Sequence, residues 1–184
     1  MTDRHRDAMP AVEPAGTVEP AGTVEPAGTV EPDEAAELRR AVHRLLGRSL
    51  HVRHLDAGSC NGCDWEISAL LNPYHDVQRL GVDFVASPRH ADLLLVTGIM
   101  TRNLEEAARR TYEAMPEPRL VVAVGACAIS GGVFAGTYAG RDGVGEVLPV
   151  DVFVPGCPPR PEALIHGLLL AVGRMAPFAG TGPT

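Results

Sequence analysis

Apolar residues along the chain follow two alternating patterns. Short runs that predict strands lie at residues 50–55, 82–86, 93–97, 120–124 and 150–154, and those at 93–97 and 120–124 are almost continuously apolar, as is typical of buried strands. Segments with helical spacing of apolar residues lie at 64–71, 103–115, where Asn103 is the expected N-cap, and 161–175. Buried strands that alternate with helices are typical of a parallel sheet covered on both faces. The pattern predicts a doubly wound, flavodoxin-like α/β domain over residues 49–176.

The N-terminal residues do not follow this pattern. A hexamer, Val-Glu-Pro-Ala-Gly-Thr, occurs three times from Val12 and is followed by Val30-Glu31-Pro32. Proline and glycine in every copy disfavour helix and strand, and too few residues are apolar to form a core. We therefore expect a disordered acidic tail over residues 1–33, an amphipathic helix over 34–48 and a flexible C-terminus over 177–184.

The net charge of −7 lies in the first 37 residues, which include this tail. Residues 1–37 contain nine acidic residues and two arginines, whereas residues 38–184 contain fourteen of each. A neutral domain with dispersed arginines offers no basic stripe for nucleic acid. The sequence has no apolar run of the ~20 residues that a membrane span needs and no secretory signal. We expect a cytoplasmic chain without a span of its own.

All four cysteines of the chain follow predicted strands. Cys60 and Cys63 come after the first strand, Cys127 after the strand at 120–124, and Cys157 after the last strand. Ligands of open α/β sheets bind at the carboxyl ends of the strands, so we expect the four thiols to converge there. Because cytosolic thiols stay reduced, metal or redox chemistry is favoured over structural disulfides.

Three chemistries fit four such thiols. They could bind an iron–sulfur cluster, form a structural zinc site of four cysteines, or include a redox-active dithiol at Cys60 and Cys63. Glycines lie beside the cysteines, and glycine lets backbone N–H groups approach cluster sulfurs, which favours the first reading. These glycines are Gly58, Gly62, Gly125, Gly131, Gly132 and Gly156. Ordinary strand-to-helix turns also use glycine, so spacing and neighbours leave the alternatives open.

Three segments together resemble one known family. They are Asp-Ala-Gly-Ser-Cys-Asn-Gly-Cys-Asp-Trp-Glu at 56–66, Val-Gly-Ala-Cys-Ala-Ile-Ser-Gly-Gly at 124–132 and Val-Pro-Gly-Cys-Pro-Pro-Arg-Pro-Glu at 154–162. In this order they resemble the small subunits of energy-converting and formate-hydrogenlyase-type [NiFe] hydrogenases. The same family includes the B subunit of NADH:quinone oxidoreductase (respiratory complex I).

The resemblance implies one [4Fe–4S] cluster, held by Cys60, Cys63, Cys127 and Cys157. It implies an electron-transfer subunit of an oxidoreductase, with no catalytic residue of its own. The implied partners are the large catalytic subunit of a hydrogenase, or the 49 kDa-type subunit of complex I, with further iron–sulfur and membrane subunits. Through such partners the chain would lie peripherally at the inner face of the cell membrane.

One detail distinguishes the two branches of this family. The complex I pattern has two adjacent cysteines, whereas here Asn61 and Gly62 separate Cys60 from Cys63. This spacing resembles the hydrogenase branch; the alternative is a B-type subunit that donates electrons to quinone. Glu66 is a candidate proton relay, although the helix dipole also favours a carboxylate at the start of a helix.

Overall fold

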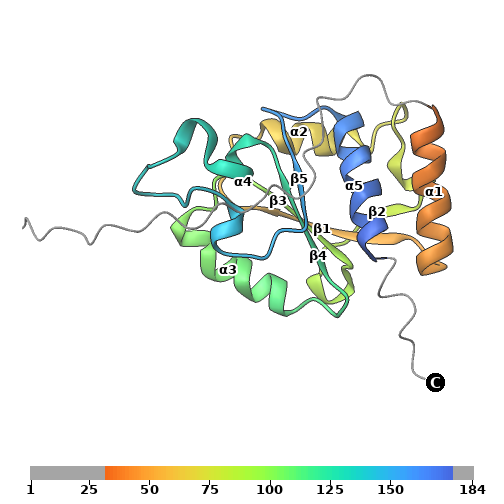
Figure 1. Cartoon of the computed structure of the whole chain (residues 1–184), viewed down its shortest axis with the longest axis horizontal. Coiled ribbons are helices and arrows are strands. Elements are labelled where there is room, and N and C mark those ends of the chain that lie inside the picture. The colour runs from red at the N-terminus through yellow and green to blue at the C-terminus, as the bar shows by residue number, and fades with distance from the viewer. Residues whose placement is uncertain (1–31, 176–184) are drawn as a thin grey trace, which may run out of the picture.

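The computed structural model describes residues 32–175, with side chains from residue 34, and has a five-stranded sheet at its centre (Figure 1). The strands are β1 (Leu50–Asp56), β2 (Val82–Phe84), β3 (Leu93–Thr97), β4 (Leu120–Val124) and β5 (Val152–Val154). All neighbours pair in parallel, in the order β2-β1-β3-β4-β5. This is the flavodoxin-like doubly wound order, so the expected α/β class is confirmed. The predicted tail up to residue 31 and the predicted C-terminus lie outside the described residues.

Helices cover both faces of this sheet. They are α1 (Pro32–Leu46), α2 (Gly62–Ala69), α3 (Arg102–Glu113), α4 (Ala126–Ser130) and α5 (Pro161–Met175). Short 3-10 turns include η1 (Val77–Leu80), η3 (Gly132–Phe134) and η4 (Val144–Glu146). Figure 1 shows α1 and α5 side by side on one side of the sheet and α3 on the other.

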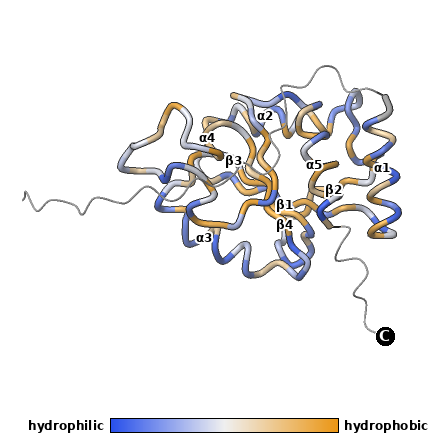
Figure 2. The backbone as a smooth tube through the Cα atoms, in the orientation of Figure 1, coloured by the Kyte–Doolittle hydropathy of each residue, from blue (hydrophilic) through white to orange (hydrophobic). Residues whose placement is uncertain are grey.

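The alternation of side chains along the central strands divides the core into two parts. Leu93 and Leu95 of β3 pack with α1 and α5, whereas Leu94 and Val96 pack with α3 and α4. Successive residues of a strand point to opposite faces, so a fully apolar strand supplies both layers. Figure 2 shows this as a hydrophobic centre, with hydrophilic stretches along α1 and α3.

Several element boundaries differ from those expected. α1 begins and ends two residues before the 34–48 span, and β2 and β5 are shorter than the runs that indicated them. The N-cap expected at Asn103 was wrong: α3 begins at Arg102, and Thr101 is its N-cap. The N–H of Thr101 donates to the carbonyl of Ala57 (2.8 Å), and this contact with the loop after β1 fixes the helix start.

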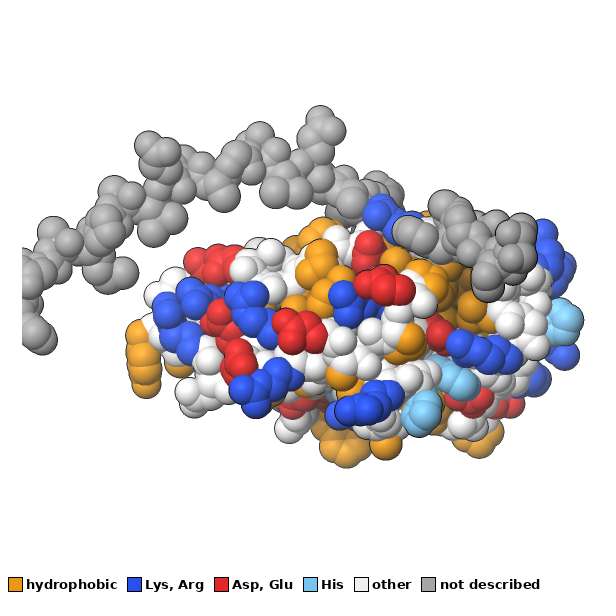
Figure 3. Space-filling model, turned by 90° about the horizontal axis from the view of Figure 1, so that it is seen from below, with side chains coloured by type: hydrophobic (Ala, Val, Ile, Leu, Met, Phe, Trp, Pro, Cys, Tyr) orange, Lys and Arg blue, Asp and Glu red, His pale blue; other side chains and the backbone are white. Residues whose placement is uncertain are grey.

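The surface of the described domain carries charges of both signs. On the face seen from below, acidic and basic side chains are interspersed (Figure 3). Of the helices within residues 32–175, none has the length and apolar character needed to cross a membrane.

Candidate functional site

The loop after β1 passes over the carboxyl end of β3. Gly98, directly after β3, has φ +87°, and a β-carbon there would lie 2.5 Å from the carbonyl carbon of Gly58 and 2.6 Å from the nitrogen of Ser59. No other residue would leave room for this crossing. The close approach carries Cys60 and Cys63 across β3 towards β4.

The loops after β1, β4 and β5 meet at Gly125. A β-carbon on Gly125 would lie 2.6 Å from Sγ of Cys63 and 3.5 Å from the carbonyl oxygen of Gly156. A β-carbon on Gly62 would lie 3.6 Å from Sγ of Cys60 and 3.8 Å from the ring of Pro158. Three strand ends thus bring their cysteine-bearing loops to one place at the carboxyl edge of the sheet.

The glycines beside the cysteines have two different roles. Gly62, Gly125 and Gly132 lie against the sulfurs of Cys60, Cys63 and Cys127, and a β-carbon on Gly132 would stand 3.1 Å from the last of these sulfurs. The other three, Gly58, Gly131 and Gly156, instead pack closely against Thr101, Ala135 and Pro159. Half of the expected glycines therefore shape the sulfur environment, and half shape turns.

The four thiols are free, and they influence one another electrostatically. Burial, followed by the charge of Asp64 and the other three thiols, raises the pKa of Cys63 to about 12. Burial, followed by Cys157 and Cys60, also raises the pKa of Cys127, against hydrogen bonds from the N–H groups of Cys127 and Val133. Four thiolates so close together need cationic compensation, which a bound metal centre supplies while deprotonating its ligands.

A polar network, which sequence reasoning missed, lies beneath the Cys60–Cys63 loop. Asp64 is its centre: Oδ1 accepts from Thr97 Oγ1 (3.0 Å) and lies 2.9 Å from His54 Nε2, and Oδ2 accepts from Ser59 Oγ. Burial lowers the pKa of His54, against the opposing effect of Asp64. The network ties the start of α2 to β1 and β3; only the carboxylate directly after Cys63 hinted at it in the sequence.

The remaining candidate residues lie around this centre. Glu66 is half-buried in α2, and Trp65 beside it is 75% exposed. Among residues 32–175, no group of three or more histidine, cysteine or acidic side chains is arranged to hold a single metal ion. A four-iron cluster places its own irons and sulfides between its ligands, so its four cysteine sulfurs lie farther apart than the ligands of a single metal ion. Its fit therefore depends on the thiols and their surroundings.

Comparisons with known proteins identify the family of the chain. Residues 60–171 match the family described as NADH ubiquinone oxidoreductase, 20 Kd subunit. The chain is 50% identical over 133 residues to a probable membrane-bound hydrogenase subunit of Pyrococcus furiosus, covering 72% of this chain and 80% of that protein. It is 41% identical over 141 residues to formate hydrogenlyase subunit 7 of Escherichia coli, covering 77% of this chain and 55% of that protein.

The chain is also similar to a subunit of a quinone oxidoreductase and to a chain of a sulfur reductase. The B subunit of the NADH-quinone oxidoreductase of Citrifermentans bemidjiense is 50% identical over 114 residues, which cover 62% of this chain and 66% of that protein. A chain of an archaeal membrane-bound sulfane sulfur reductase superposes with a TM-score of 0.62 at 34% identity, covering 76% of this chain and 75% of that one. The chain therefore belongs to the NADH:ubiquinone oxidoreductase 20 kDa subunit family, whose hydrogenase and quinone oxidoreductase members are subunits of oxidoreductase complexes.

Proposed function

We propose that this chain holds one [4Fe–4S] cluster on Cys60, Cys63, Cys127 and Cys157 and transfers electrons within a larger, membrane-associated oxidoreductase of the hydrogenase type. One observation carries the proposal: three loops bring all four thiols to one glycine-lined place at the carboxyl edge of the sheet. A bound cluster accepts and donates single electrons. The chain contributes the thiolates, and the N–H groups of Cys127 and Val133 stabilise the sulfur of Cys127.

The cluster is tested by analysing the full chain, purified without oxygen, for iron, acid-labile sulfide and zinc. We expect a brown protein with four irons and four sulfides per chain, which gives an electron paramagnetic resonance signal when reduced. Substitution of any one of the four cysteines by serine should abolish or alter that signal, whereas Ser68→Ala, on the exposed side of α2, should not. A colourless protein with one zinc ion would instead establish the structural zinc site.

The partner surface is the second part of the proposal. Four large apolar side chains here are exposed to solvent: Trp65 (75% exposed), Val133 (83%), Phe134 (42%) and Tyr138 (91%). Trp65 lies two residues after Cys63, and Val133 and Phe134 belong to η3, whose first residue touches Cys127. Exposed apolar residues beside the cysteines are typical of interaction sites, and we assign this surface to the large catalytic subunit.

Co-purification from the native host tests this assignment. Trp65→Ser combined with Val133→Ser should release the large subunit, whereas Tyr74→Ser, an equally exposed aromatic residue after α2, should not. A stable monomer with an intact, reducible cluster would favour a free electron carrier.

The main alternative is a B-type subunit that donates electrons to quinone. The identity to the B subunit of a NADH-quinone oxidoreductase supports it. The separation of Cys60 from Cys63 by two residues favours the hydrogenase type. Nickel in the co-purified complex, together with hydrogen-dependent dye reduction, would establish the hydrogenase type, and quinone-dependent oxidation without nickel would establish the alternative.

A further inference from the structure

A second site, away from the cysteines, lies between α1 and η1. It is an open pocket of about 740 Å³, lined by Ala35, Ala36, Arg39, Arg40, His43, Arg44, Arg79 and Leu80. Its position on α1 places it on the layer formed by α1 and α5. A pocket of this volume accommodates a few residues of an extended peptide.

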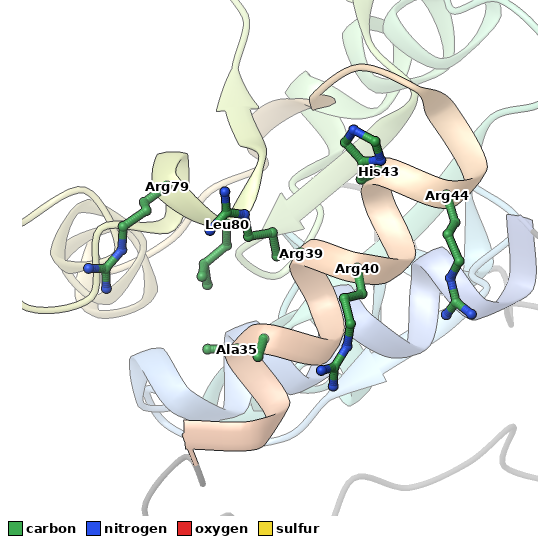
Figure 4. A pocket seen from close by; sticks show the side chains of 8 residues that line it. Ala35, Arg39, Arg40, His43, Arg44, Arg79 and Leu80 are labelled. Atoms are coloured by element: carbon green, nitrogen blue, oxygen red, sulfur yellow. The ribbon is translucent and has the colours of Figure 1, made fainter.

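The lining of this α1–η1 pocket is strongly basic. Four arginines and one histidine surround it, and no acidic side chain of the described residues does. Figure 4 shows Arg39 extending from α1 towards Leu80, while Arg40 and Arg44 lie along α1 on a common side. Arg79 has a single long contact to Asp76 (3.8 Å), an exposed pair of little strength. Ala35 and Leu80 add apolar surface, so the pocket suits an anionic group with an apolar neighbour.

The chain itself carries a segment of that chemistry. Residues 1–31 contain six acidic residues and two arginines. Four of the acids, Glu13, Glu19, Glu25 and Glu31, each stand between a valine and a proline. A Val-Glu-Pro unit presents one carboxylate between two apolar side chains, which complements arginines beside an alanine and a leucine.

The distances along the chain allow this contact. α1 begins at Pro32, so Glu25 precedes it by seven residues, which span up to ~25 Å when extended. Arg44 lies twelve residues into α1, ~18 Å along the helix. Glu25, Glu19 and Glu13 can therefore reach every arginine of the pocket, and the covalent link gives them a high local concentration.

We propose that a Val-Glu-Pro unit of the N-terminal repeats binds the α1–η1 pocket, with its glutamate on Arg39 and its apolar residues on Ala35 and Leu80. Several equivalent units compete for one pocket, so the repeat raises the occupied fraction without requiring tight binding by any one copy. The bound tail shields the basic side of α1 and competes with any external anion for the same arginines. This inference is independent of the cluster and of the complex that contains it.

Nuclear magnetic resonance on the full chain tests the contact. The variant E13Q/E19Q/E25Q/E31Q removes four tail carboxylates, and we expect the backbone signals of Arg39 and Leu80 and the guanidinium signal of Arg39 to move. Inorganic phosphate serves as the competing anion: if the tail occupies about two-thirds of the pockets, phosphate should bind wild type roughly threefold more weakly than the variant. Raising salt from about 0.1 M to about 1 M should shift the wild-type signals towards the variant, because the Debye length falls from about 10 Å to about 3 Å.

The control is E113Q/E146Q, which removes two exposed carboxylates outside the pocket lining. It should leave the signals of Arg39 and Leu80 unchanged and phosphate binding equal to wild type. Equal phosphate affinity in wild type and the tail variant, or no signal change confined to the pocket, would overturn the proposal. Wild type that binds phosphatidylglycerol vesicles as strongly as the tail variant does would also overturn the proposal, because a membrane would then be the occupant.

Discussion

Gly125, the residue after β4, lies directly against the sulfur of Cys63, so that a β-carbon at position 125 would stand 2.6 Å from Sγ. Its backbone has φ 88° and ψ 158°, a region that is almost exclusive to glycine. The loops of two strands that are not neighbours, β1 and β4, meet at this contact. The contact thus fixes the distance between the Cys63 thiol and the segment that leads to Cys127.

Gly125→Ala is expected to reduce cluster content several-fold. The added methyl group collides with Cys63, and the backbone strain costs about 1–3 kcal/mol, so the thiol moves away from the other three. Iron and sulfide per chain, with visible absorption, measure the loss. Gly145→Ala is the matched control, because no atom lies within 4 Å of its β-carbon position and its φ is not positive. Equal cluster content in both variants would contradict this role of Gly125.

Asp64→Asn is expected to raise the reduction potential of the cluster. The carboxylate directly follows Cys63, and its negative charge opposes the addition of an electron nearby, while asparagine can still accept from Thr97 and Ser59. Across a partly screened distance of several ångströms the expected change is on the order of 10–100 mV. Potentiometric titration followed by electron paramagnetic resonance measures it.

Asp76→Asn is the charge-matched control for that titration. Asp76 precedes η1, outside the polar network of Asp64, and its only ion pair is the long contact with Arg79 among the described residues. The reduction potential of the cluster in Asp76→Asn should remain within a few millivolts of the wild-type value. A lower potential in Asp64→Asn would contradict the prediction. So would an equal change in both variants, because the effect would then not depend on the position of Asp64.

His54 is expected to make the domain less stable in mild acid. Burial, as the main cause, lowers its pKa below 6.5 in the folded chain, so the unfolded chain binds the proton more readily. The stabilising contribution is present above about pH 6.5 and disappears as the pH falls through the folded pKa. His54→Gln removes this titration but can keep a hydrogen bond to Asp64.

Urea unfolding at about pH 7.5 and about pH 5.5 measures that contribution. The wild type should lose more free energy of unfolding between the two values than His54→Gln does. His43→Gln is a suitable control, because His43 is exposed on α1 and should leave the wild-type pH dependence in place. An equal loss in wild type and His54→Gln would contradict the prediction.

Removal of residues 1–33 is expected to leave folding and cluster binding unchanged. The repeats have too few apolar residues to contribute to a core, and α1 is anchored by Leu38 and Val42, which are buried against α5 and the sheet. Visible absorption and thermal unfolding of the truncated and full-length chains measure the effect. Loss of cluster on truncation would show that the tail has a structural role.

The sequence by itself determined the layers of the fold. The continuous apolar runs of β3 and β4 have the bounds expected for them, Leu93–Thr97 and Leu120–Val124, because strands buried on both faces must be apolar throughout. The helix at Pro161–Met175 likewise has its expected bounds, since proline starts it and helical spacing continues through it. Placing the cysteines after strands was enough to predict that they share one edge of the sheet.

Only the tertiary structure decided how the loops at that edge meet. The close approach of Gly98 to Ser59, and of Gly125 to Cys63, depends on the order of strands in the sheet, which local patterns do not encode. The same holds for Asp64, whose partners His54 and Thr97 lie ten and thirty-three residues away in the sequence. Thr101, not Asn103, is the N-cap of α3, and its N–H donates to the carbonyl of Ala57, a contact between distant segments that local capping preferences do not encode.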